Sequence, residues 1–196
     1  MAANTAFDGR DLARVAVFAA LIVVLGTVPP IPVPGLVPVT AQTLGVMLAG
    51  TVLGARRGAA AVLIVLVLVA VGLPVLSGGR GGLGVFVGPT GGYLVGWVLG
   101  AAVAGLIARW AVGRVPWWRA ALGALVGGVL VVYACGIPVT ALVAGIGVGD
   151  AAVAALAFVP GDLLKVVAAT VLTVALQRAY PPAFALPRRG AAGTSA

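Results

Sequence analysis

Residues 56–76 read RRGAAAVLIVLVLVAVGLPVL, two arginines followed by an uncharged and almost entirely aliphatic run. A helix that crosses a membrane needs about 20 mostly apolar residues. Basic residues commonly mark the cytoplasmic end of such a helix. The stretch therefore predicts a transmembrane span over 58–76 that begins at the cytoplasmic surface.

The composition of the whole chain agrees with this stretch. Of 196 residues, 62% are hydrophobic and 8% are charged, and the mean hydropathy is +1.23. Soluble domains are about 45–50% apolar and about 25% charged. We therefore expect an all-α integral membrane protein. Six spans occupy the chain as one membrane domain over 12–178, with a short cytoplasmic tail at 1–11 and a flexible one at 179–196.

Proline clusters, glycines and arginines divide the chain into these spans, because prolines end helices and arginines avoid the membrane interior. The six predicted spans are 12–28, 39–55, 58–76, 91–108, 120–137 and 160–176. The proline-rich segment 29–38 is predicted to be a stiff loop folded near the membrane surface. The segment 139–159 is predicted to be a loop with a short interfacial helix from Asp150.

Basic residues fix the predicted orientation. With both termini in the cytoplasm, the outer loops carry Arg80 alone, whereas the cytoplasmic side carries Arg10, Arg14, Arg56, Arg57, Arg109, Arg114, Arg119, Arg178, Arg188 and Arg189. This bias obeys the positive-inside rule. A further crossing over 139–159 would place the C-terminal arginines outside, which disfavours it.

The composition disfavours metal sites, general base catalysis, disulfides and nucleic-acid binding. It has no histidine and no glutamate, so the commonest metal ligands and general bases are missing. The single cysteine, Cys135, cannot form an intrachain disulfide, and its surroundings indicate a buried, inert thiol. The net charge of +8 arises at the ends of apolar runs and does not indicate nucleic-acid binding.

Asp162 and Lys165 are the most informative pair of residues. They lie three apart at the start of the last span, so they share one helix face. Charged groups in a span are costly and normally face a cavity or a partner. The pair is either a self-neutralising ion pair, with Asp162 at the favourable helix N-terminus, or a polar anchor for a solute.

Other spans carry further polar residues that are candidates for ligand contact. Gln42 lies with Thr40 and Thr43 at the outer end of the second span, where it binds either a ligand or a neighbouring helix. Thr90 and Tyr93 belong to the run GPTGGY at 88–93, which forms either a close approach to a ligand or a tight turn with an interfacial aromatic.

Two further features carry open alternatives. Arg80 lies in the glycine-rich run 78–84, which lacks the lysine and serine or threonine of a phosphate-binding loop. It attracts an anionic solute or is a solvated loop charge. Ala16 and Ala20 place small residues four apart on the first span, which suits close helix packing inside the protein or docking to another membrane protein.

Several segments together resemble the BioY family, the biotin-specific S components of energy-coupling factor (ECF) transporters. The matching segments are PVTAQTLG (38–45), LAG (48–50), LGARRG (53–58), GLPV (72–75), GPTGGYLVG (88–96) and PGDLLK (160–165). They follow one another in order along the chain, and the resemblance covers about residues 12–178. Ala41 and Trp97 depart from the family pattern in ways that suggest changes in packing.

The resemblance implies a six-helix S-component fold with a biotin site near the outer surface. It implies that Asp162 and Lys165 contact the ligand, and it places Gln42 and Tyr93 in family motifs. Ala16 and Ala20 match the family's docking face for the transmembrane coupling subunit, which works with ATPases. The protein would then lie in the bacterial cytoplasmic membrane, with biotin as transported ligand and no cofactor.

Energy supply separates this interpretation from its alternatives. The chain has no nucleotide-binding motif and little for a proton relay, so a binding subunit driven by partner ATPases explains both absences. The expected cycle is capture outside, loop closure and reorientation on the coupling module. The alternatives are an S component for another vitamin such as riboflavin or thiamine, and a standalone facilitator. An intramembrane hydrolase is disfavoured because Ser77 has no activating histidine.

Overall fold

The computed structural model describes residues 7–30, 40–109 and 114–184. Within these ranges the protein is helical and has no β-strand, apart from an isolated bridge between Leu76 and Arg80. The helices are α1 (Gly9–Gly26), α2 (Gln42–Leu53), α3 (Ala55–Ala70), α4 (Gly84–Val87), α5 (Gly91–Ala108), α6 (Trp117–Leu125), α7 (Val132–Ala144), α8 (Val148–Ala155) and α9 (Val159–Ala179).

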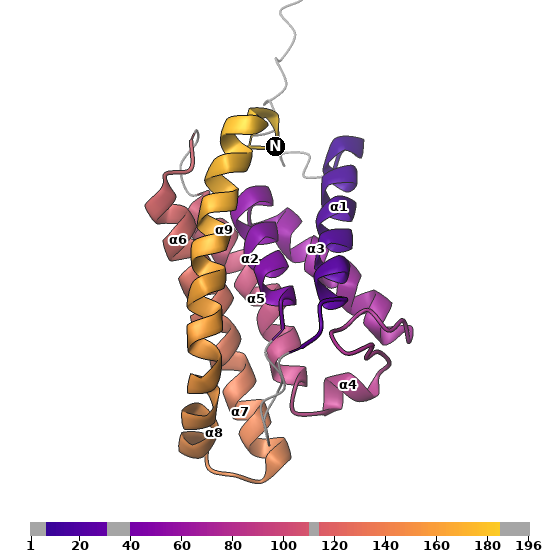
Figure 1. Ribbon diagram of the computed structural model, residues 1–196. Helices are drawn as coiled ribbons and strands as arrows, with labels where there is room; N and C mark the ends of the chain where they lie inside the picture. Colours follow the sequence, from indigo (N-terminus) through magenta and orange to yellow (C-terminus); the bar gives the residue numbers. More distant parts are fainter. Residues whose placement is uncertain (1–6, 31–39, 110–113, 185–196) are drawn as a thin grey trace, which may run out of the picture.

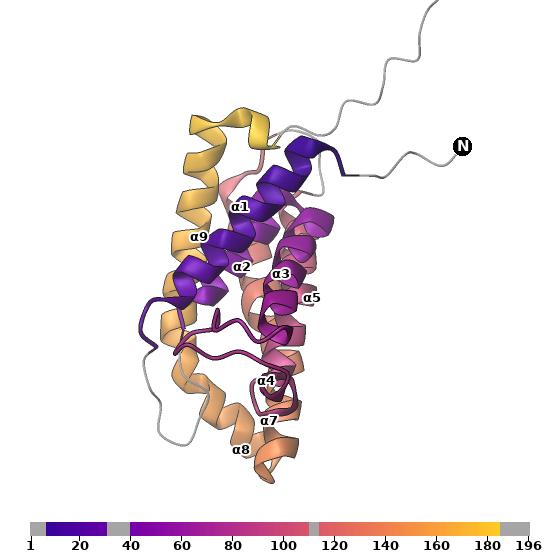
Figure 2. The ribbon, with the colours of Figure 1, turned by 90° about the vertical axis from the view of Figure 1, so that its right-hand side faces the viewer.

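The helices form an elongated bundle in which α1 begins and α9 ends at the same end (Figures 1 and 2). The short helices α4 and α8 lie towards the opposite end. Helix α2 is central and packs against α1, α3, α5 and α9. Ten of its twelve residues are buried, which agrees with this central place.

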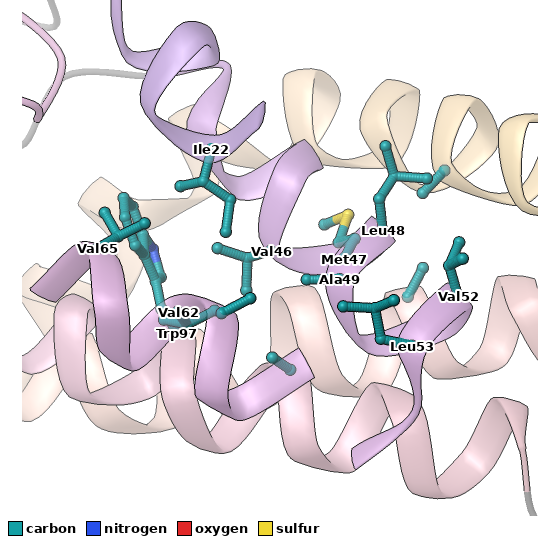
Figure 3. Packing of buried hydrophobic residues seen from close by; sticks show 14 of the residues in the cluster. Ile22, Val46, Met47, Leu48, Ala49, Val52, Leu53, Val62, Val65 and Trp97 are labelled. Atoms are coloured by element: carbon teal, nitrogen blue, oxygen red, sulfur yellow. The ribbon is translucent and has the colours of Figure 1, made fainter. Parts of the chain in front are cut away.

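The core lies where α1, α2, α3 and α5 meet (Figure 3). Ile22 from α1, Val46 from α2, Val62 and Val65 from α3 and Trp97 from α5 are at most 5% exposed. Each belongs to a span predicted from its apolar run. The faces of α1, α3 and α5 that point away from this core carry exposed aliphatic residues, as expected for helices surrounded by lipid.

Glycines allow a sharp turn at one place and a close approach of two backbones at another. Gly54 has φ +85°, a conformation that side chains rarely adopt, and it turns the chain sharply from α2 into α3. A Cβ on Gly100 of α5 would overlap the carbonyl oxygen of Gly127. Small residues at helix contacts are typical of membrane bundles.

Charged side chains fasten the end at which α1 begins. Arg57 of α3 donates to Asp11 of α1 over 2.8 Å. Arg109, just after α5, donates to the carbonyl oxygens of Val52 over 2.6 Å and Phe184 over 2.8 Å. Burial lowers the pKa of the Arg109 guanidinium from its ordinary value, yet an arginine keeps its charge.

The predicted end of the fifth span at Ile137 is wrong. Helix α7 passes through Pro138 and ends at Ala144, where Gly145 adopts the left-handed conformation. Proline removes one backbone hydrogen bond but fixes a φ that a helix accepts, and membrane helices tolerate it. The short helix predicted from Asp150 is present as α8. Between α6 and α7, residues Val126–Val131 wind as a π-helix, which the sequence did not predict.

Three helical stretches among the described residues are long and apolar enough to cross a membrane: Gly91–Ala108, Trp117–Ala144 and Val148–Ala179. Helix α2 has 12 residues, about 18 Å at 1.5 Å per residue, which is shorter than the hydrocarbon core of about 30 Å. Residues 40, 41 and 54 of the span predicted over 39–55 are not helical, and residue 39 lies outside the described ranges.

Candidate solute-binding site

The Asp162–Lys165 pair forms at the start of α9. Pro160 occupies the first turn of this helix, where its missing N–H costs nothing, and Asp162 follows at the electropositive end of the helix. Lys165 Nζ lies 2.8 Å from Asp162 Oδ1. Their side chains are 14% and 8% exposed. The predicted pair is therefore real, and it is shielded from solvent.

Each member of the pair has a second partner from another helix. Tyr133 of α7 donates its hydroxyl to Asp162 Oδ2 over 2.6 Å. Lys165 Nζ donates to Thr43 Oγ1 at the start of α2 over 3.0 Å. The ammonium has three hydrogens, so one remains for another acceptor. The two free lone-pair positions of the carboxylate likewise leave room for a donor.

Aromatic rings stand beside the carboxylate. Tyr133 meets Tyr93 edge-on at a centroid distance of 6.4 Å and Phe158 edge-on at 6.5 Å. The ring of Tyr93 lies against Gly136, where a Cβ would overlap it. The glycines beside Tyr93 serve packing as well, because a Cβ on Gly92 would overlap α7. Such rings supply apolar contact area with defined geometry.

Gln42 joins separate segments of the chain through hydrogen bonds of its side-chain amide. Its side-chain nitrogen donates to the carbonyl oxygens of Ile22 over 3.3 Å and Val75 over 3.0 Å, and its oxygen accepts from the N–H of Ser77 over 2.9 Å. It is 1% exposed. Both amide hydrogens are therefore used, which ties the end of α1 and the loop at 75–77 to the start of α2.

The glycine-rich segment is an ordered turn that carries Arg80. Gly78, Gly79 and Gly82 have positive φ angles of 78°, 69° and 87°. Arg80 donates from Nε to the carbonyl oxygen of Ser77 over 3.2 Å. Thr90 lies in the turn before α5, where it is 8% exposed and donates to Val85.

These groups line a single cavity that is open to the surroundings on one side. All six of the residues predicted as ligand contacts line it, namely Gln42, Arg80, Thr90, Tyr93, Asp162 and Lys165. The remaining lining residues are Thr40, Thr43, Leu76, Leu94, Trp97, Gly128, Val132, Tyr133 and Phe158. A mostly apolar cavity with a few converging polar groups is typical of a small-molecule site.

Tyr133, Phe158 and Gly128 were not predicted as part of the site. Tyr133 is a phenol inside an otherwise apolar span, and buried tyrosine hydroxyls usually have a hydrogen-bond partner. A search of the apolar spans for tyrosines whose hydroxyls need a partner would have identified Tyr133. Ala16 and Ala20 do not reach the cavity: both are exposed on α1, on the side away from buried Val15 and Ala19. No cluster of histidine, cysteine or acidic residues that could hold a metal occurs in the described part of the chain.

Fold and site define a helical membrane protein with a cavity that combines apolar walls and a few polar groups. A model of the BioY family matches residues 1–182. The biotin transporter BioY of Rhizobium etli is 54% identical over 178 residues, which cover 88% of this chain and 95% of that protein. The probable biotin transporter BioY of Bacillus subtilis is 41% identical over 86% of this chain and 91% of that protein.

A crystal structure of the S-component for biotin from an ECF-type ABC transporter has the same fold. Its TM-score is 0.82 at 31% sequence identity, over 88% of this chain and 95% of that chain. The chain therefore belongs to the BioY family and has the fold of an S component. Its relatives are transporters and not enzymes.

Proposed function

We propose that this protein is the high-affinity biotin-binding subunit of an ECF-type vitamin importer, which captures biotin at the outer face and delivers it inward with an energy-coupling module. The observation that carries the proposal is the shielded Asp162–Lys165 pair beside a cavity. The names of the relatives and of the structural neighbour supply the ligand.

Biotin suits the groups in the cavity. Its ureido ring carries N–H donors beside a carbonyl acceptor, and Asp162 and Lys165 present an acceptor beside a donor, 2.8 Å apart. Hydrogen bonds to charged groups contribute about 1.5–3 kcal/mol each. Tyr93, Trp97 and Leu94 supply apolar surface for the thiophane ring. Arg80 faces the same cavity and suits the carboxylate of the tail. Thr90 also lines the cavity, whereas Gln42, whose amide binds backbone groups, supports the cavity wall.

The proposed topology has six spans with both termini in the cytoplasm. In its favour, α1 begins and α9 ends at one end of the bundle (Figure 1), as an even number of crossings requires. That end carries Arg57 and Arg109, in keeping with the positive-inside rule. The cavity lies nearer the other end, formed by the first turns of α2, α5 and α9, and would open outward. We place this multi-pass protein in a bacterial cytoplasmic membrane.

The proposed partner surface is the exposed side of α1. Ala16 and Ala20 present small side chains there, beside exposed Leu12 and Val17. Small residues four apart let another helix approach closely. This surface would meet the transmembrane coupling subunit, whose ATPases supply the energy. Biotin is then the transported ligand, no cofactor is needed, and the remaining contacts are with the lipid bilayer.

Biotin binding to the purified protein tests the proposal, with riboflavin and thiamine as control ligands. We expect submicromolar affinity for biotin alone, and its loss in Lys165→Met. Arg109→Met is the matched control, because it removes a half-buried cation that does not line the cavity. Binding of another vitamin would show an S component of different specificity. Biotin uptake into proteoliposomes without any coupling module would show a facilitator.

A further inference from the structure

Tyr133 and Lys165 hold the two oxygens of one carboxylate. Tyr133 Oη lies 2.6 Å from Asp162 Oδ2, and Lys165 Nζ lies 2.8 Å from Asp162 Oδ1. Asp162 is 6% exposed. A carboxylate on a short side chain can rotate about its last bond, and its orientation decides where it accepts hydrogen bonds. Two partners on opposite oxygens fix that orientation before any ligand arrives.

The π-helical turn Val126–Val131 sets the direction of Tyr133. A π-helical turn inserts about one extra residue and therefore rotates everything that follows by about 100°. Gly127 and Gly128 within the turn pack so closely that a Cβ would overlap Gly100 and Met47, respectively. Tyr133 follows two residues after this turn. Such turns occur frequently at functional sites, and here the turn brings a phenol onto the cavity wall.

The ring of Tyr133 is restrained on both sides. Tyr93 and Phe158 meet it edge-on, with interplanar angles of 79° and 76°. These contacts come from α5 and from the turn before α9, so two segments besides α7 itself restrain one hydroxyl. A restrained donor keeps its hydrogen bond at a low cost in side-chain entropy. The position of the hydroxyl is therefore a property of the fold and does not depend on a ligand.

We propose that Tyr133 is a positioning residue for ligand specificity: it fixes the Asp162 carboxylate so that the cavity presents one acceptor position directly beside the Lys165 ammonium. An acceptor and a donor side by side match the N–H and C=O that share one edge of a cyclic urea. This assignment rests on the proposed function for the identity of the ligand. The geometry of the carboxylate does not depend on that identity.

Infrared spectroscopy of the ligand-free protein tests the geometry. The chain has four acidic residues, so the difference between wild type and Asp162→Asn isolates the carboxylate band of Asp162. We expect Tyr133→Phe to shift this band, because the carboxylate loses a charge-assisted hydrogen bond. Tyr93→Phe is the matched control, since it removes the same hydroxyl from the neighbouring ring and should leave the band in place. An unchanged band in Tyr133→Phe would overturn the inference.

A double-mutant cycle on biotin affinity tests the role. We expect Tyr133→Phe to weaken binding about ten- to a hundredfold in the wild-type background, but by less than about threefold in Asp162→Asn. A residue that only fills space would weaken binding by the same factor in both backgrounds. Tyr93→Phe should behave in that additive way, because no bond joins its hydroxyl to Asp162 in the structure.

The two measurements separate failure of the inference from failure of the proposed function. If wild type binds no biotin and the infrared band still shifts, the ligand is wrong and Tyr133 remains the positioning residue of Asp162. If wild type binds biotin and Tyr133→Phe binds equally well, the proposed function stands and the role of Tyr133 is refuted. Additive losses in the cycle would also refute it.

Discussion

The two ends of the bundle bury charged side chains in different ways. At the end where α1 begins, Arg57 and Asp11 join α1 to α3, and Arg109 binds the carbonyl oxygens of Val52 and Phe184. At the cavity, Asp162 and Lys165 bind each other and one hydroxyl each. Charges at the first end fasten protein segments to one another, whereas charges at the cavity keep hydrogen-bonding capacity for something else.

This difference teaches how to distinguish a structural charge from a binding charge. Burial alone does not separate them, because Asp11 and Asp162 are both 6% exposed. Their surroundings do separate them: Asp162 lines a cavity with aromatic walls, and Asp11 does not. A buried charge that borders a cavity is a candidate for ligand recognition.

Substituting asparagine for the aspartate at each end should give the largest difference in biotin affinity, and it tests directly whether the two charges have different roles. We expect Asp162→Asn to lower biotin affinity about a hundredfold or more, because a charge-assisted acceptor becomes a weaker neutral one. Asp11→Asn should leave affinity within about twofold, because it does not border the cavity. Calorimetric titration of both variants measures this. Equal losses of biotin affinity in the two variants would mean that Asp11 and Asp162 do not divide into a structural and a binding charge.

Thermal stability should respond in the opposite order: loss of Arg109 should lower the thermal midpoint more than loss of the cavity pair. Arg109→Met leaves two carbonyl oxygens without their donor, and each such loss costs about 1–3 kcal/mol when buried. A lower thermal midpoint in detergent is therefore expected. Replacing the cavity pair together, as Asp162→Asn with Lys165→Met, should change the midpoint much less, because removal of both charges avoids a lone buried ion. A larger drop in that double variant would give the cavity pair a structural role.

Gln42 combines the two roles, because it borders the cavity and also fastens protein segments to one another. It lines the cavity, yet its amide binds the backbone of Ile22, Val75 and Ser77. We expect Gln42→Leu to lower the thermal midpoint and also to weaken biotin binding about tenfold, by displacing the turn that carries Arg80. Thr51→Val is the control, since Thr51 is buried on the same helix and bonds Thr173 away from the cavity. It should affect stability alone.

The apolar runs predicted an all-helical fold, but not the length of every helix: α2 covers only Gln42–Leu53 of the span predicted over 39–55, and α3 ends at Ala70, within the span predicted over 58–76. The sequence also predicted the position of the Asp162–Lys165 pair, because a spacing of three puts two residues on one helix face. Residues with only local evidence, such as Thr90 and Arg80, line the same cavity in the structure.

The features that the sequence did not predict depend on contacts between distant residues. Tyr133 lies 29 residues before Asp162, and no local spacing relates the two. The π-helical turn that directs Tyr133 coincides with the packing of Gly127 and Gly128 against α5 and α2. The helix through Pro138 was missed because local propensity disfavours proline, whereas packing in a membrane bundle tolerates it.

Arg80 should give the smallest effect, and it tests whether the mouth of the cavity attracts its ligand by charge. Its side chain is partly exposed and bonds Ser77 through Nε. Attraction at an exposed site acts mainly on the association rate and is screened by salt. We expect Arg80→Gln to slow association of biotin about two- to fivefold at low salt, with little change in dissociation. Stopped-flow binding at low and high salt measures this. Arg80→Lys should keep most of the rate, because it keeps the charge. Faster dissociation in Arg80→Gln, at any salt concentration, would instead make Arg80 a direct contact that belongs with Asp162 and Lys165.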